Sequence, residues 1–163
     1  MTHGVPCNAY SFVKKGQIRI DRRKLEKTKI PNSPILGKLK EGKDIVYGGK
    51  KYRAKDLTFK EDDLKISFVL DTSTNSQVVK LVKNSDVLVC ETSYSSELSD
   101  KAKEFHHLTS KQAGEIAKKS GSKKLIITHL SQRHERETGK ILAETKKVFK
   151  NTELAEDLKV VEV

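Results

Sequence analysis

The feature that most constrains this chain is an alternation of strand-like and helix-like segments from residue 64 onward. Apolar runs rich in β-branched residues, which have the length of buried strands, lie at 64–70, 86–91, 123–128 and 158–163. Segments with helical spacing, which separate or follow them, lie at 76–84, 95–105, 109–121 and 137–151. This alternation predicts an α/β fold in which helices cover a sheet.

The N-terminal part of the chain differs in charge. Residues 1–60 hold 16 Lys and Arg against 5 Asp and Glu, whereas residues 61–163 hold 17 against 17. The whole net charge of +11 therefore lies in the first 60 residues. An excess placed in this way favours a polyanionic partner such as nucleic acid. A lysine-rich surface that is merely solvated would show the same count.

The basic part also has a different local pattern. It predicts a short helix at 21–29, a loop at 30–39 and a hairpin at 44–53 around two adjacent glycines. We therefore expect three regions: a strand or loop at 1–11, a basic insertion at 12–60 and an α/β body at 61–163.

Composition restricts the cellular setting. No apolar run approaches the roughly 20 residues that a membrane-spanning helix needs, and residues 1–15 lack the apolar core of a secretion signal. Cys7 and Cys90 have neither metal-site spacing nor a disulfide-dense pattern, so we expect both thiols to be small core residues. These features predict a cytoplasmic protein without a membrane partner.

Three predicted strands end in side chains that can bind a metal ion. One strand runs into Asp71, the next ends in Glu91, and the third runs into His129. In an open α/β sheet, functional side chains gather where strands end and loops begin. Carboxylate and imidazole are the ligands of zinc in hydrolytic sites, where zinc-bound water becomes a nucleophile at neutral pH.

Each candidate also has a purely structural interpretation. Asp71 can cap the turn after its strand, and His129 can be a hydrogen-bonded histidine at the edge of a core. Thr109 and Gln112 have the spacing of a helix capping box, and His3 is exposed by default because it lies near a terminus. Neither an HxHxDH nor an HExxH motif occurs in the chain.

Six stretches, taken in order, resemble one known family. They are HGVPCNAYSF, IPNSPILGKLKEGKDI, FVLDTS, SDVLVCETSY, HHLTSKQAGEIA and LIITHLSQRH. Together they resemble the second half of ribonuclease Z, a metallo-β-lactamase-fold endonuclease that removes the 3′ trailer from precursor tRNA. The resemblance runs from His3 to about His134. It implies the C-terminal half of a metallo-β-lactamase-like αββα fold, with a basic arm inserted.

The resemblance implies roles for individual residues. His3 matches a ligand to one zinc, Asp71 the aspartate that bridges two zincs, and His129 a ligand to the second zinc. His107 matches a histidine that acts near the scissile phosphate, supported by the carboxylate of Glu91. Two further positions match the family's catalytic segments, namely Thr109 and Arg133.

The insertion at 12–60 matches the segment in which family members carry a flexible arm that grips tRNA. The basic residues expected to contact RNA there are Arg22, Arg23, Lys24, Lys38 and Lys40. Phosphate neutralisation would make the affinity depend on salt, and helical RNA would be recognised by its shape and backbone.

The family's HxHxDH motif supplies the remaining zinc ligands, and it would lie N-terminal to His3. In the complete site two zinc ions are expected, with a metal-bound hydroxide attacking the phosphodiester. Three accounts of this chain follow: a fragment of a longer enzyme, one half of an enzyme completed by a separate HxHxDH-bearing chain, or a non-catalytic RNA-binding remnant. A homodimer is a further expectation for its partner. A related metal-dependent hydrolase with another phosphodiester substrate is a further alternative.

Overall fold

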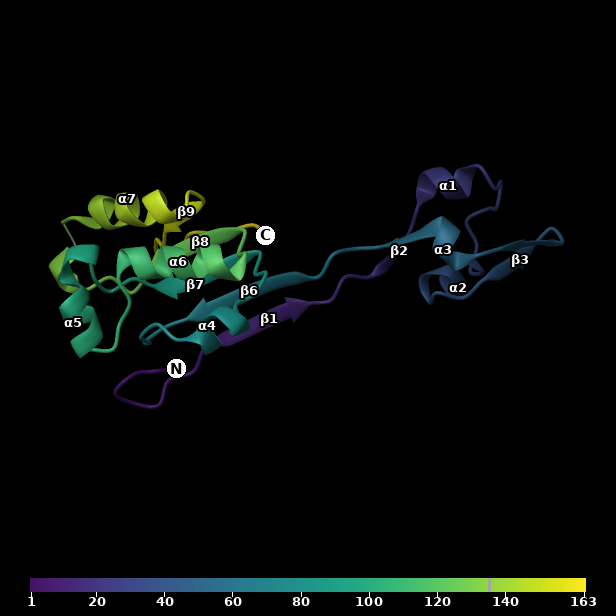
Figure 1. The fold of residues 1–163 in the computed structure, drawn as a ribbon. Coiled ribbons are helices and arrows are strands. Elements are labelled where there is room, and N and C mark those ends of the chain that lie inside the picture. The colour runs from purple at the N-terminus through teal and green to yellow at the C-terminus, as the bar shows by residue number, and fades with distance from the viewer. Residues whose placement is uncertain (135) are drawn as a thin grey trace. The chain divides into compact units, whose positions relative to one another are not determined.

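A computed structural model describes residues 1–134 and 136–163 of the chain. The chain forms two compact units (Figure 1). The larger unit consists of Met1–Val13 and Leu64–Val163, and the smaller unit consists of Lys14–Asp63.

The larger unit is built on a five-stranded sheet with the order β1-β6-β7-β8-β9. The strands are β1 (Tyr10–Lys14), β6 (Leu64–Val69), β7 (Val87–Glu91), β8 (Lys124–Thr128) and β9 (Thr152–Leu154). From β6 to β9 every neighbouring pair is parallel. In this register Glu91 lies opposite Thr128. The carboxyl ends of β6, β7 and β8 therefore meet at one edge of the sheet.

Helices cover one face of this sheet (Figure 1). The helical segments are α4 (Ser76–Leu81), η1 (Ser96–Leu98), α5 (Ser99–Glu104), α6 (Ser110–Ser120), η2 (Gln132–His134) and α7 (Thr138–Val148). Buried side chains of α4, α6 and α7 pack against those of the strands in one core, which includes Val78, Ile116, Ile141, Leu88 and Ile127. The parallel strands and their helical cover confirm the predicted α/β fold.

Helix α6 begins and ends as the sequence predicts. The Thr109 side chain accepts from the backbone N–H of Gln112, and the Gln112 Oε1 accepts from the backbone N–H of Thr109. Gly121 ends the helix in the left-handed conformation, which glycine adopts without steric cost. On the face towards α7, a Cβ at Gly114 would lie 2.9 Å from the Val148 Cβ. Glycine therefore allows the two helices to approach closely.

The last strand is not where the apolar pattern predicts it. Residues 158–163 form no strand, and Leu158 is fully exposed. The last strand of the sheet is instead β9, which lies directly after α7. The pairing begins where the Leu125 N–H donates to the Asn151 carbonyl, and residues 152–154 then continue it along β8. Pairing with β8 is therefore complete before the apolar tail begins. The helix predicted at 95–105 is divided into η1 and α5.

The opposite face of the sheet carries exposed aromatic side chains. Val69 of β6 is buried under the helices, whereas Phe68 and Leu70 on either side of it are each 38% exposed. The Phe12 ring of β1 lies 6.0 Å from the Phe68 ring and is itself exposed. No helix among the described residues is long and apolar enough to cross a membrane.

The smaller unit has a core of its own. Its elements are β2 (Ile18–Ile20), α1 (Arg22–Glu26), α2 (Leu36–Lys40), β3 (Ile45–Tyr47), β4 (Lys50–Tyr52), α3 (Ala54–Leu57) and β5 (Thr58–Lys60). Strands β3 and β4 form the predicted hairpin, and β2 pairs antiparallel with β5. The loop predicted at 30–39 is wrong in part, because α2 begins within it. Leu36 and Leu39 of that helix are buried against Ile30 and Leu57.

Candidate metal centre

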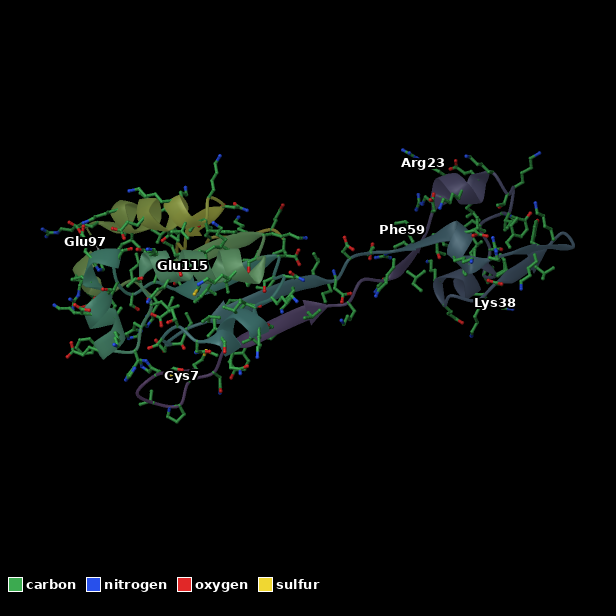
Figure 2. The ribbon with its side chains drawn as sticks, in the orientation of Figure 1. Cys7, Arg23, Lys38, Phe59, Glu97 and Glu115 are labelled. Atoms are coloured by element: carbon green, nitrogen blue, oxygen red, sulfur yellow. The ribbon has the colours of Figure 1, made fainter. Side chains whose placement is uncertain are left out.

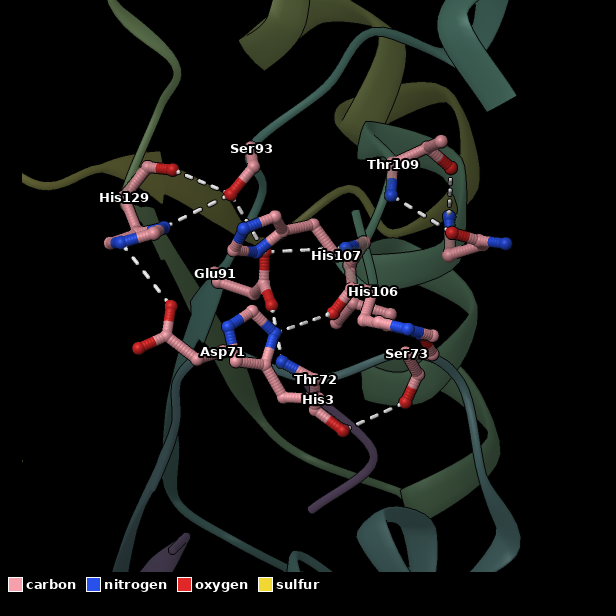
Figure 3. A network of polar contacts seen from close by, with 12 residues as sticks. His3, Asp71, Thr72, Ser73, Glu91, Ser93, His106, His107, Thr109 and His129 are labelled. Carbon is pink, nitrogen blue, oxygen red and sulfur yellow. Dashed lines mark hydrogen bonds and ion pairs between the residues drawn. The ribbon is translucent and has the colours of Figure 1, made fainter. Parts of the chain in front are cut away.

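Two of the predicted metal ligands lie together at the carboxyl edge of the sheet. Asp71 follows β6 and His129 follows β8, and the Asp71 Oδ1 lies 3.3 Å from the His129 Nε2 (Figure 3). Both residues have left-handed backbone, with φ of 50° and 57°. This conformation is uncommon for residues other than glycine, and it gathers at functional sites. Here it turns the chain sharply after each strand.

Glu91, the last residue of β7, is fully buried and accepts four hydrogen bonds. Its Oε1 accepts from the Thr72 backbone N–H at 2.6 Å. Its Oε2 accepts from the Ser93 hydroxyl at 2.7 Å, the His107 Nδ1 at 3.0 Å and the Leu108 backbone N–H at 3.2 Å. All four partners can donate, which is the environment of an ionised carboxylate. Glu91 thus connects the segments that follow β6, β7 and α5.

His107 is held by the backbone on both sides as well as by Glu91. Its N–H bonds to the Ala102 carbonyl at the end of α5. The residues that follow His107 pair with Tyr94, which lies after β7. The Tyr94 N–H donates to the Leu108 carbonyl, and the Ser110 N–H donates to the Tyr94 carbonyl. The His107 ring, which is half-buried, lies 5.5 Å from the His129 ring.

His3 lies beside this group, although a terminal position predicts exposure. Thr2 anchors the segment, since its N–H bonds to the Thr72 Oγ1 and its carbonyl accepts from the Ser73 N–H at 2.8 Å. The His3 ring is half-buried and lies 5.0 Å from the His107 ring. Its Nδ1 is 3.2 Å from the His106 carbonyl oxygen.

The hydrogen bonds determine which ring nitrogen carries a proton in two of the histidines. A carbonyl and a carboxylate can only accept, so His3 and His107 each donate from Nδ1. Their Nε2 atoms are then available as ligands when the rings are neutral. Metal-binding histidines commonly have this arrangement, because the second nitrogen is oriented by an outer partner.

A set of ligand atoms converges at this edge. Within the described ranges, Asp71, His107 and His129 each offer a ligand atom within 4.8 Å of the others. One carboxylate and two imidazoles suit zinc in composition. This group differs from the predicted ligand set in one member. It contains His107, which is predicted to be catalytic, and the predicted ligand His3 lies beside His107. The residues present therefore fit a metal ion.

The remaining predicted catalytic residues lie at different places. The exposed Arg133 guanidinium is 5.3 Å from the Tyr94 ring centre, and that ring is 6.1 Å from the His107 ring. Arg133 is thus at the rim of the site. The Thr109 hydroxyl is buried at the N-terminus of α6, where it serves as the helix cap.

Sequence reasoning missed Ser93, whose hydroxyl lies between Glu91 and His129. The signal was available, because side chains two residues apart along a strand point to the same side. The neighbouring Cys90 is fully buried. Burial, together with the charge of Glu91, raises the pKa of the Cys90 thiol, so it is a core residue and not a nucleophile. Cys7 is half-buried.

The predicted RNA contacts all lie in the smaller unit. Arg22, Arg23 and Lys24 belong to α1, Lys38 and Lys40 belong to α2, and all five are exposed (Arg23 and Lys38 are labelled in Figure 2). Within residues 14–63, Lys24 pairs with Asp21, whereas the other four make no ion pair. The two helices border a cavity of about 560 Å³ whose lining includes Arg19, Arg22 and Lys40.

Comparison with known proteins identifies relatives over the whole chain. No model of a protein family matches. The chain is 36% identical over 165 residues to ribonuclease Z of Archaeoglobus fulgidus, covering 99% of this chain and 54% of that protein. It is 37% identical over 171 residues to ribonuclease Z of Listeria welshimeri, covering 100% of this chain and 55% of that protein.

One solved structure shares part of the fold. The metallo-β-lactamase fold protein YhfI of Bacillus subtilis has a TM-score of 0.52 and 26% identity, covering 57% of this chain and 37% of that chain. The chain spans about half the length of the curated relatives it matches.

Proposed function

We propose that this chain, which is homologous over its length to about half of ribonuclease Z and has part of the metallo-β-lactamase fold, supplies the C-terminal part of a zinc-dependent endonuclease site for precursor tRNA. The reaction would be hydrolysis of the phosphodiester before the 3′ trailer. The observation that carries the proposal is the convergence of Asp71, His107 and His129 at one edge of the sheet. The rest of the ligand set would come from an HxHxDH-bearing segment outside this sequence.

The metal ligands of this chain would be Asp71 and His129, with His3 completing the set from the N-terminal segment. The Asp71 Oδ1 and the His129 Nε2 are 3.3 Å apart, so both atoms can bind one ion after a small movement. Bound zinc would lower the pKa of a water molecule and stabilise the negative charge of the phosphate oxygens. The exposure of His129 leaves room for an RNA strand to reach the ion.

His107 would handle a proton in the same reaction. Its Nδ1 donates to Glu91, so a proton on Nε2 can only be given away towards the open side of the site. The hydrogen bond to Glu91 fixes the orientation of the ring that this role requires. His107 would therefore protonate the leaving oxygen, and Arg133 would meet the phosphate from the rim.

The smaller unit would bind the body of the tRNA. Its cations exceed its anions by 16 to 8, and Arg22, Arg23, Lys38 and Lys40 make no ion pair within residues 14–63. Each exposed cation that neutralises a phosphate releases counterions from the RNA, and this release favours binding. The same features favour a second candidate function, a non-catalytic RNA-binding module, because the unit has its own core.

The central experiment is cleavage of an end-labelled precursor tRNA by the purified chain with added zinc, alone and with a separate HxHxDH-bearing half. The variant is Asp71→Ala, and the matched control is Asp157→Ala, which removes an exposed carboxylate outside the site. We expect cleavage at the trailer that is lost only with Asp71→Ala. Equal cleavage by Asp71→Ala and the parent would refute the metal role. Binding without cleavage in either mixture would favour the RNA-binding module.

The arm is tested separately by the salt dependence of precursor binding. The double variant Arg22→Ala with Arg23→Ala removes two unpaired cations, whereas the control Lys43→Ala with Arg53→Ala removes two that are ion-paired. We expect the first to flatten the slope of log K against log salt by about 0.7–0.9 for each lost phosphate contact. The same slope in both double variants would exclude α1 from the RNA interface.

A further inference from the structure

The Ser93 hydroxyl occupies a position that no assigned role explains. It lies 2.7 Å from the Glu91 Oε2, 3.0 Å from the His129 Nδ1 and 3.0 Å from the His129 carbonyl oxygen (Figure 3). Ser93 itself is only 3% exposed. A buried hydroxyl between a carboxylate and a candidate metal ligand is placed to control that ligand.

The chemistry of the three groups determines the direction of the hydrogen bonds. A serine hydroxyl has one proton to donate, and the ionised Glu91 carboxylate is its shortest and strongest acceptor. Once the proton points to Glu91, it is not shared with the His129 carbonyl oxygen, and the Ser93 Oγ can only accept from the His129 Nδ1. The His129 Nδ1 must then carry a proton, which leaves the lone pair on Nε2, the atom that faces Asp71.

We propose that Ser93 is a positioning residue, which uses the charge of Glu91 to hold His129 in the Nδ1–H tautomer with Nε2 ready for a metal ion. The inference rests on the proposed function only for the identity of that ion. Through Glu91 the same network holds the Nδ1–H of His107. One buried carboxylate thus orients both imidazoles, directly for His107 and through Ser93 for His129.

The neighbouring Thr92 provides a matched control. It is also fully buried, but its Oγ1 has no hydrogen-bond partner among the described residues. Thr92→Val therefore removes a hydroxyl beside the network without breaking a bond in it. Ser93→Ala removes the acceptor of the His129 Nδ1, and Ser93→Thr keeps it.

The first measurement is the tautomer of His129 in the metal-free chain. Long-range ¹H–¹⁵N NMR at a pH of about 8, where imidazole is neutral, distinguishes Nδ1–H from Nε2–H. We expect Nδ1–H in the parent, in Thr92→Val and in Ser93→Thr, and a gain of Nε2–H in Ser93→Ala. Nε2–H in the parent would overturn the proposal, whether or not Ser93→Ala folds.

The second measurement is zinc affinity by chelator competition. Loss of such an outer partner typically weakens metal binding 10–100-fold. We expect that loss for Ser93→Ala, with recovery in Ser93→Thr and parent-like binding in Thr92→Val. Unchanged affinity and tautomer in Ser93→Ala would refute the role of Ser93. Failure of tRNA cleavage with these results intact would instead refute the proposed endonuclease function and leave the role of Ser93 standing.

Discussion

Replacing Glu91 by Gln should destabilise the larger unit strongly although the side chain keeps its shape. The amide NH₂ group must replace one of the two carboxylate oxygens, both of which face donors. Fewer hydrogen bonds are lost when it replaces Oε1, because that atom accepts only from the Thr72 N–H. That change removes a hydrogen bond to a charged group, about 1.5–3 kcal/mol, and leaves a buried N–H unpaired, about 1–3 kcal/mol. Because the two costs overlap, we expect the free energy of unfolding to fall by about 2–5 kcal/mol.

The assay is urea unfolding of the whole chain, followed by far-UV circular dichroism. For a slope of about 2 kcal/mol per M, the urea midpoint should fall by roughly 1–2.5 M. The control Glu97→Gln changes an exposed carboxylate, and its midpoint should stay within experimental error of the parent. A Glu91→Gln midpoint that matches this control would refute the view that Glu91 is an ionised carboxylate with four donors.

Three further variants test other parts of the fold. The Lys123 ammonium holds the pKa of Asp86 below its usual value, so this stabilisation is complete above about pH 4 and disappears as the pH falls through the folded pKa. Urea midpoints measured from about pH 5 to pH 3 should therefore fall less in Asp86→Asn than in the parent. Gly114→Ala should lower the Tm, because crowding against Val148 costs about 1–3 kcal/mol against a helix-propensity gain of about 1 kcal/mol. Leu39→Ala, at a fully buried position, should cost about 2–5 kcal/mol and accelerate amide exchange within residues 14–63.

Sequence patterns predict the α/β layers well because strand and helix periods are local properties. The capping box of α6 is local too, since Thr109 and Gln112 are three residues apart and each side chain bonds to the backbone N–H of the other. The position of β9 is not local. An apolar run at 158–163 looks like a strand, but only the pairing with β8 decides which residues join the sheet, and 152–154 reach that edge first.

The candidate site also has features that the sequence predicts and features that depend on the folded chain. That strand ends meet at one edge follows from a parallel sheet, so the sequence brings Asp71, Glu91 and His129 together in principle. The sequence does not reveal the left-handed backbone of Asp71 and His129, because no glycine marks either turn. It also does not reveal that Thr2 bonds to the Thr72 loop, which is what places His3 beside His107.

The network around Glu91 explains how the larger unit can hold its ligands in place before any metal binds. The carboxylate bonds to the Thr72 N–H immediately after Asp71, to Ser93, which contacts His129, and to His107 itself. Asp71 is thus next to a residue that bonds to this buried charge, His129 contacts it through Ser93, and His107 bonds to it directly. Metal affinity should therefore depend on Glu91 although it offers no ligand atom, and the two sides of the site should weaken together when it is replaced.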